Sequence, residues 1–78
     1  MKFLEDIPNK QCKVSLYWWN SKFIVKFETP FLEQTYKFSE FDVSGEDEVK
    51  TFIDQPEFLT KVYKRFEEMA ADIQFGKF

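Results

Sequence analysis

Apolar and polar residues alternate along two neighbouring segments of the chain, residues 12–19 and 22–29. Neighbouring side chains of a β-strand point to opposite faces of a sheet, so the alternation predicts two strands with one apolar face each. The two residues between them, Asn20 and Ser21, predict a tight hairpin turn, because Asn tolerates the positive φ that such turns require. Every apolar residue then has an apolar partner across the hairpin.

A third strand is predicted over residues 33–39, after a tight turn at Pro30-Phe31. In this register Phe27 pairs with Gln34 and Phe23 with Phe38. The N-terminal segment 2–8 is expected to pack as an arm rather than to add a short edge strand. The three strands share one apolar face, which is expected to form the core and consists of Val14, Leu16, Trp18, Phe23, Val25, Phe27, Tyr36 and Phe38.

After residue 43 the apolar positions change from a period of two to helical spacing. Ser44 stands three residues before Asp47, which resembles a capping box and predicts a short helix over residues 46–53. Pro56 favours the first turn of a second helix, and the apolar positions that follow keep helical spacing to residue 74. Phe75 and Phe78 are expected to pack against the edge of the core.

These elements predict a single α+β domain covering residues 1–78. A three-stranded antiparallel β-meander (strands about 12–19, 22–29 and 33–39) is followed by a short helix (46–53) and a long C-terminal amphipathic helix (56–74). The long helix is expected to pack on the apolar face of the sheet. Because neighbouring side chains alternate, Trp18 is predicted to be the core tryptophan and Trp19 to lie on the opposite face.

Composition limits the classes of function that need to be considered. The 78 residues carry a net charge of −3, and aromatic residues make up 21% of them, which is typical of a folded chain with an aromatic core. No segment is apolar enough to span a bilayer or to act as a signal peptide. The single cysteine, Cys12, is expected to be a small buried residue, and the chain is expected to be cytoplasmic.

The sheet face opposite the predicted core is unusual, because it combines aromatic and basic residues. Tyr17, Trp19 and Ile24 form an apolar group on it. The lysines that surround this group are Lys13, Lys22, Lys26 and Lys37. Trp and Tyr dominate the energetics of protein interfaces, and a polar rim is typical of them. The seven residues are therefore the candidate interaction site.

Three interpretations of this face compete. It is an ordinary solvated surface, a surface for a protein partner or a second copy of the chain, or a stacking platform for single-stranded nucleic acid. The net negative charge and the acids Glu28 and Glu33 on the same face argue against nucleic acid. The sequence favours a small protein-interaction module, with single-stranded nucleic-acid binding as the alternative.

Nothing in the sequence indicates catalysis. The chain has no histidine, and its glycines, Gly45 and Gly76, do not form a phosphate-binding loop. The acids between residues 42 and 48 do not have the spacing of a calcium-binding loop, and acids at a helix N-terminus are common for electrostatic reasons. We therefore expect no enzyme activity, no catalytic residues, no metal site and no cofactor.

Overall fold

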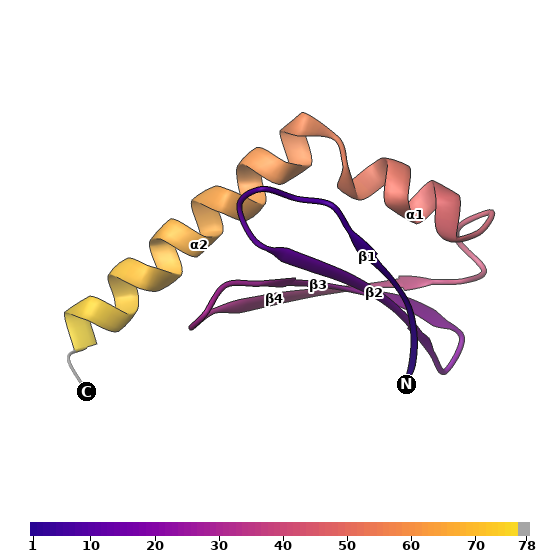
Figure 1. Ribbon diagram of the computed structural model, residues 1–78, viewed down its shortest axis with the longest axis horizontal. Coiled ribbons are helices and arrows are strands. Elements are labelled where there is room, and N and C mark those ends of the chain that lie inside the picture. The colour runs from indigo at the N-terminus through magenta and orange to yellow at the C-terminus, as the bar shows by residue number, and fades with distance from the viewer. Residues whose placement is uncertain (77–78) are drawn as a thin grey trace.

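The computed structural model of the chain describes residues 1–76, with side chains as far as Gln74. It has an antiparallel sheet and two helices, which confirms the α+β class (Figure 1). The sheet order follows the chain, β1-β2-β3-β4. The elements are β1 (Lys2–Ile7), β2 (Lys13–Trp19), β3 (Lys22–Glu28), β4 (Glu33–Ser39), α1 (Glu46–Ile53) and α2 (Pro56–Gly76). The packing expected for Phe75 and Phe78 concerns side chains outside the described part.

The register predicted for the central hairpin is confirmed. Trp18 lies opposite Phe23, and Trp19 lies opposite Lys22. The Asn20-Ser21 turn has positive φ at both residues, 53° at Asn20 and 61° at Ser21. Two consecutive left-handed residues are typical of a type I′ turn, whose twist matches that of the strands it joins. The pairing predicted between β3 and β4 is also confirmed, including Phe23 with Phe38.

The left-handed conformation of Ser21 leads to a first prediction. A residue with a Cβ atom pays for positive φ, whereas glycine adopts this conformation at no steric cost. We expect Ser21→Gly to raise the free energy of unfolding by about 0.5–1 kcal/mol, since the steric gain exceeds the extra entropy of the unfolded chain. Urea denaturation measures the change. Ser44→Gly, outside any positive-φ position, is the control and is not expected to stabilise the chain.

The N-terminal segment forms an edge strand, so the predicted packed arm and the predicted strand count of three are both wrong. Strand β1 pairs antiparallel with β2, with Phe3 opposite Tyr17 and Ile7 opposite Val14. The register shifts between Phe3 and Glu5, which is a β-bulge at Leu4. The bulge breaks the two-residue period of the segment, which is why its sequence does not alternate like that of β2 or β3.

Both helices lie on the same side of the sheet and meet at an angle above it (Figure 1). The buried apolar side chains of the two layers form one core cluster. Its members are Val14, Leu16, Val25 and Phe27 from the sheet and Val49, Ile53, Val62 and Phe66 from the helices. The helical and strand periodicities of the sequence therefore meet in a single apolar layer, as predicted.

Trp18 faces the helix side of the sheet but lies outside this core cluster of the described residues, so its predicted place in the core is wrong. The side chain is half-buried, and its indole N–H donates a hydrogen bond to Glu40 Oε2 at 3.0 Å. Trp18 stands at the end of β2 next to the hairpin turn. The β4–α1 connection, which carries Glu40, meets the ring there instead of a helix.

The N-terminus of α1 differs from the predicted capping box. Gly45 occupies the N-cap position and makes no side-chain hydrogen bond there. Ser44 is one residue too early for its hydroxyl to cap the helix. Its backbone N–H instead donates to Glu48 Oε2 at 2.7 Å, so a first-turn glutamate reaches back to the chain before the helix. The acid that reaches back is Glu48 and not Asp47, so the predicted pairing of Ser44 with Asp47 is wrong.

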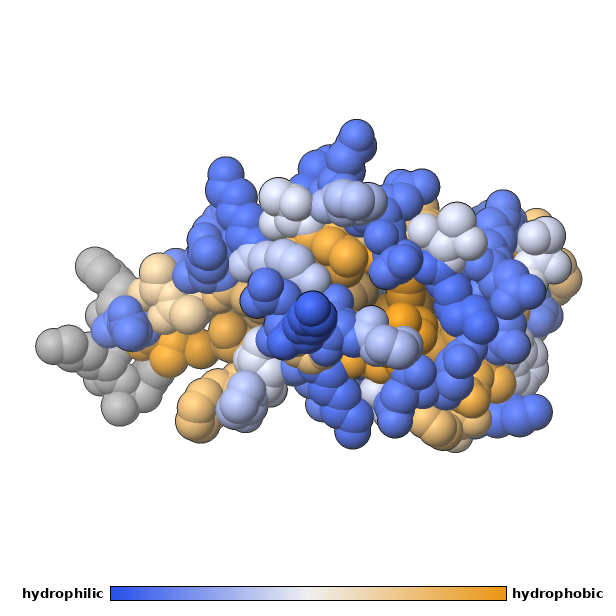
Figure 2. Space-filling model, turned by 45° about the horizontal axis from the view of Figure 1, so that its top comes forward, coloured by the Kyte–Doolittle hydropathy of each residue, from blue (hydrophilic) through white to orange (hydrophobic). Residues whose placement is uncertain are grey.

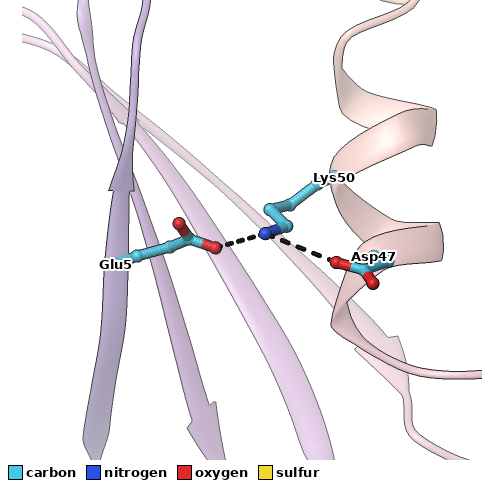
Figure 3. Close-up of polar contacts among 3 residues, drawn as sticks. All are labelled: Glu5, Asp47 and Lys50. Atoms are coloured by element: carbon cyan, nitrogen blue, oxygen red, sulfur yellow. Dashed lines mark hydrogen bonds and ion pairs between the residues drawn. The ribbon is translucent and has the colours of Figure 1, made fainter.

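A lysine joins α1 to the edge strand. Lys50 Nζ lies 2.5 Å from Glu5 Oε1 and 3.5 Å from Asp47 Oδ1 (Figure 3). The hydrogen bond to Glu5 raises the pKa of Lys50 above its usual value of 10.5, and the charges of Glu5 and Asp47 add to this rise. Glu5 reaches the helix side because the bulge places it opposite Leu16 of the core face.

The raised pKa of Lys50 predicts a pH dependence of stability. A group that binds its proton more tightly when folded stabilises the folded state fully below its unfolded pKa, and this stabilisation is lost as the pH rises through the folded pKa. We expect the melting temperature of the wild type to exceed that of Lys50→Met by a constant difference from pH 6 to about pH 9, and this difference to decrease above about pH 10.5. Thermal melts across this range measure the difference. Lys64→Met, at an exposed position of α2, is the control.

The long helix is fixed to the sheet by polar contacts as well as by the core. Gln34 Nε2 donates to the backbone oxygen of Val62 at 2.8 Å, and Gln34 Oε1 accepts from the Tyr36 hydroxyl at 2.5 Å. Arg65 extends this network by donating to the Tyr36 oxygen at 2.8 Å. At the other edge, Asn9 of the β1–β2 loop donates to the Tyr63 hydroxyl at 2.9 Å. The helix is thus held along both of its sides.

Candidate functional site

The sheet face that no helix covers, which we call the open face, is organised in four rows across the strands. The registers set Trp19 beside Lys22 and Ser39, and set Phe3, Tyr17, Ile24 and Lys37 in the next row. A third row holds Asp6, Ser15, Lys26 and Thr35, and the last row holds Lys13, Glu28 and Glu33. The aromatic residues therefore occupy the two rows without acids, and the acids Asp6, Glu28 and Glu33 occupy the other two.

Four apolar side chains gather at the β1–β2 edge of the open face. We call Met1, Phe3, Tyr17 and Trp19 the edge patch. Trp19 is 54% exposed, Phe3 is 52% exposed and Met1 is 62% exposed, while Tyr17 is half-buried between them. The rings of Phe3 and Tyr17 meet edge to face with their centroids 5.6 Å apart. Met1 falls on this face because it stands two residues before Phe3.

Ile24 is not part of an exposed group, so the predicted apolar triplet is wrong in this residue. Ile24 is only 3% exposed although no helix lies over it. It stands on the central strand β3, between Tyr17 and Lys37 across the sheet and between Lys22 and Lys26 along its own strand. The ring and the aliphatic stems of these neighbours cover it, as long lysine side chains commonly do.

The four candidate lysines have different surroundings. Lys26 is half-buried, and its Nζ lies 5.4 Å from the centre of the Tyr17 ring in a cation–π contact. Lys22 and Lys37 are exposed in the two aromatic rows, which contain no acid among their paired residues. Lys13 is exposed in the last row, opposite Glu28. Three of the four lysines therefore border the aromatic end of the open face.

Sequence reasoning missed Phe3 and Met1, which belong to the patch only because β1 is a strand. The segment "KFLEDI" shows no simple alternation, since the bulge inserts Leu4 between two residues that would otherwise be neighbours in register. The signal that remains is the pair Phe3 and Ile7. Each is the type of residue that favours strands, but four residues apart they fit a helix equally well.

Other parts of the described structure offer weaker sites. A cavity of about 600 Å³ opens between the end of β1 and the α1–α2 junction, and it is lined by Ile7, Pro8, Lys50, Thr51, Asp54, Gln55 and Pro56. Lys50, the cation among them, is already paired with Glu5. Among the described residues, no three acids or cysteines come together as metal ligands do. Partial burial raises the pKa of the Cys12 thiol, which disfavours the reactive thiolate.

No protein-family model matches the chain, and no curated protein or solved structure matches it significantly. Neither helix, over the residues described, is both long and apolar enough to cross a bilayer. The function is therefore inferred from the arrangement of the open face alone.

Proposed function

We propose that the protein is a non-enzymatic cytoplasmic module that binds a protein partner through the edge patch. The observation that carries this proposal is the row arrangement: exposed Phe3 and Trp19 lie beside half-buried Tyr17 on a sheet face that no helix covers. Large aromatic side chains at the centre of a contact provide most of the binding energy of protein interfaces. The sheet holds these rings in place before any partner arrives, which reduces the entropy lost on binding.

The charges around the patch favour an acidic partner segment with an apolar anchor. Lys22 and Lys37 lie in the aromatic rows and Lys26 borders them, whereas the acids of this face, Asp6, Glu28 and Glu33, lie in the two rows beyond. An acidic stretch aligned along the aromatic rows meets lysines, and a basic stretch there is repelled. Electrostatic complementarity of this kind sets the orientation and the association rate of a complex.

Single-stranded nucleic acid is the alternative ligand of the same rings, and the ring contacts argue against it. A stacking platform needs free ring faces for successive bases. Lys26 sits over the Tyr17 ring, and Phe3 contacts the same ring edge to face. Tyr17 is therefore already engaged, so that the open face offers fewer free rings than its composition suggests.

A library of random peptides displayed on phage tests the proposal. Selection on the immobilised wild-type chain is expected to enrich acidic peptides that carry an aromatic or large aliphatic residue. The selected peptides are expected to bind the double variant Phe3→Ser/Trp19→Ser at least about thirtyfold more weakly than the wild type, because two hot-spot side chains are removed. Phe31→Ser and Phe41→Ser are matched controls, since these rings are 92% and 83% exposed but lie outside the open face.

Each outcome decides between the alternatives. Enriched peptides that bind the double variant as well as the wild type, or no enrichment at all, overturn the proposal. A thymidine oligonucleotide is titrated in parallel at low salt. If the oligonucleotide binds, and its binding depends on Trp19 and falls steeply with salt, the result supports nucleic-acid binding in place of the protein partner.

A further inference from the structure

Strand β4 forms one edge of the sheet, and β1 forms the other. The two edges differ in regularity, because the register of β1 shifts at its bulge whereas β4 pairs with β3 over its whole length without a shift. A regular edge strand offers its free backbone groups to a further strand. The helix side of the molecule has a mixed hydrophilic and hydrophobic surface that singles out no ligand (Figure 2), so the backbone of β4 is the more specific feature.

The hydrogen bonds at the two ends of the β3–β4 hairpin show which backbone groups of β4 point outward. The N–H of Glu40 donates to the oxygen of Ser21 at 3.0 Å, and the N–H of Thr29 donates to the oxygen of Leu32 at 2.9 Å. Bonded and non-bonded pairs alternate along an antiparallel ladder, so the even-numbered residues of β4 bond to β3. The odd-numbered residues point their N–H and C=O groups to the free edge, and they are Glu33, Thr35, Lys37 and Ser39.

One of these four residues is already engaged. The oxygen of Ser39 accepts a hydrogen bond from the N–H of Asp42 at 3.0 Å. Among the described residues, no such bond reaches the outward groups of Glu33, Thr35 and Lys37. The free edge of β4 therefore consists of three alternate residues with Thr35 at its centre.

A second copy of β4 matches this free edge when it runs antiparallel and is centred on the same residue. Thr35 then lies opposite Thr35 of the second copy, and Glu33 of each copy lies opposite Lys37 of the other. Each of these pairs exchanges two backbone hydrogen bonds, so all the free groups of the three residues are satisfied. Every other register that keeps the two open faces together separates Glu33 from Lys37.

The side-chain charges agree with the register that the backbone favours. Glu33 lies opposite Glu28 of β3, and Lys37 lies opposite Ile24. In the described part of the chain neither Glu33 nor Lys37 belongs to an ion pair, and Glu33 Oε2 accepts only from the Thr35 hydroxyl, at 2.8 Å. Opposite charges directly across a ladder stabilise a pair of strands, whereas like charges destabilise it.

We propose that the free edge of β4 binds the same edge of a second copy of this chain, antiparallel and about a two-fold axis at Thr35. The contact joins four strands from each copy into one sheet. A lysine on an edge strand usually prevents the addition of another strand, but here Lys37 meets Glu33 of the second copy. This match selects a second copy over an unrelated strand, because the same surface serves both partners.

The contact is small, so the dimer is transient. Only three residues of each copy exchange backbone hydrogen bonds, which is less than a standard interface provides. Arg65 donates to the Tyr36 hydroxyl at 2.8 Å on the helix side of the same edge. The two-fold axis brings the Arg65 side chains of the two copies closer together, and their repulsion weakens the pair further.

Sedimentation velocity of the full chain between about 5 and 500 µM, a range suited to a small interface, is the first measurement. The sedimentation coefficient of the wild type is expected to rise with concentration. Thr35→Pro removes an outward N–H but no bond to β3, and proline is tolerated in an edge strand at such a position. It is expected to weaken association by more than about tenfold. Trp19→Ser is the control for contacts through the edge patch, at the other edge of the sheet, and is expected to associate as the wild type does.

Charge reversal tests the register. Glu33→Lys alone and Lys37→Glu alone place like charges opposite each other, so each is expected to weaken association by more than about tenfold. An equimolar mixture of these two variants restores opposite charges in both pairs, and association is expected to return. Lys22→Glu gives the chain the same net charge as Lys37→Glu but lies on β3, away from the edge, and is expected to associate as the wild type does.

Thermal melts confirm that each variant is folded before it is used, and the charge variants decide the question if Thr35→Pro does not fold. A wild type that stays monomeric over the whole range excludes the contact. Folded Thr35→Pro that associates as the wild type does shows that the copies meet elsewhere. A mixture of the charge variants that stays monomeric although both are folded shows that Glu33 and Lys37 do not meet.

Discussion

Phe27→Ala is expected to lower the free energy of unfolding by about 3–5 kcal/mol, the range found when a fully buried phenylalanine is truncated. Phe27 is fully buried in the sheet layer of the core. Its ring contacts the rings of Tyr36 and Phe58, with centroid distances of 5.8 and 6.0 Å. The truncation leaves a cavity between two layers that are fixed from several sides, so the surrounding residues cannot close it.

The size of this effect matters because the chain is short. A chain of this length has a total stability of roughly 4–12 kcal/mol, so the loss removes a large fraction of it. Urea denaturation followed by circular dichroism measures the change. Phe31→Ala deletes the same atoms from a ring that is 92% exposed, and we expect it to change stability by less than about 0.5 kcal/mol. Equal effects of the two substitutions contradict the assigned core.

Gln34→Glu is expected to lower the free energy of unfolding by about 2–4 kcal/mol at pH 7, although it replaces only the amide NH2 group by an oxygen. Gln34 is 9% exposed, and its Nε2 donates to the Val62 carbonyl oxygen at 2.8 Å. The substitution puts a carboxylate oxygen against that carbonyl, so two acceptors face each other in a buried place. The Tyr36 hydroxyl still donates to the other oxygen, and this limits the loss.

The pH dependence distinguishes this cause from a loss of packing. Burial and the facing carbonyl raise the pKa of the new carboxyl above its unfolded value, so the folded state holds the proton more tightly. The penalty relative to the wild type is therefore expected to shrink as the pH falls from 7 towards 4. A protonated carboxyl can donate to Val62 again. Gln11→Glu, at an exposed position, is the control, and a penalty that is constant with pH argues against the buried charge.

The central part of the sheet was predictable because it is determined by local pattern. In β2 and β3 every second residue is apolar, and a one-residue slip would expose all of the apolar side chains. The pair Asn20-Ser21 then leaves one turn geometry that joins the strands in that register. The helices were predictable for the same reason, since Pro56 and the helical spacing of the apolar residues indicate where α2 begins.

The errors come from contacts between segments that are distant in sequence. Strand β1 is hidden by its bulge, and without β1 neither Phe3 nor Met1 can be placed beside Tyr17 and Trp19. The burial of Ile24 depends on four long neighbours on two other strands and its own, which no single segment reveals. The place of Trp18 depends on Glu40, 22 residues away. The face of the candidate site was therefore predictable, and its composition at the edge was not.

The bulge at Leu4 has a consequence for how the chain behaves among its own copies at high concentration. An exposed, regular edge strand recruits further strands and leads to fibrils, and β1 carries the exposed ring of Phe3 along such an edge. The bulge interrupts the ladder of free backbone groups within a strand of six residues, and Pro8 follows directly after it. The same irregularity that hides β1 from sequence reading thus protects it from becoming the template of an amyloid-like stack.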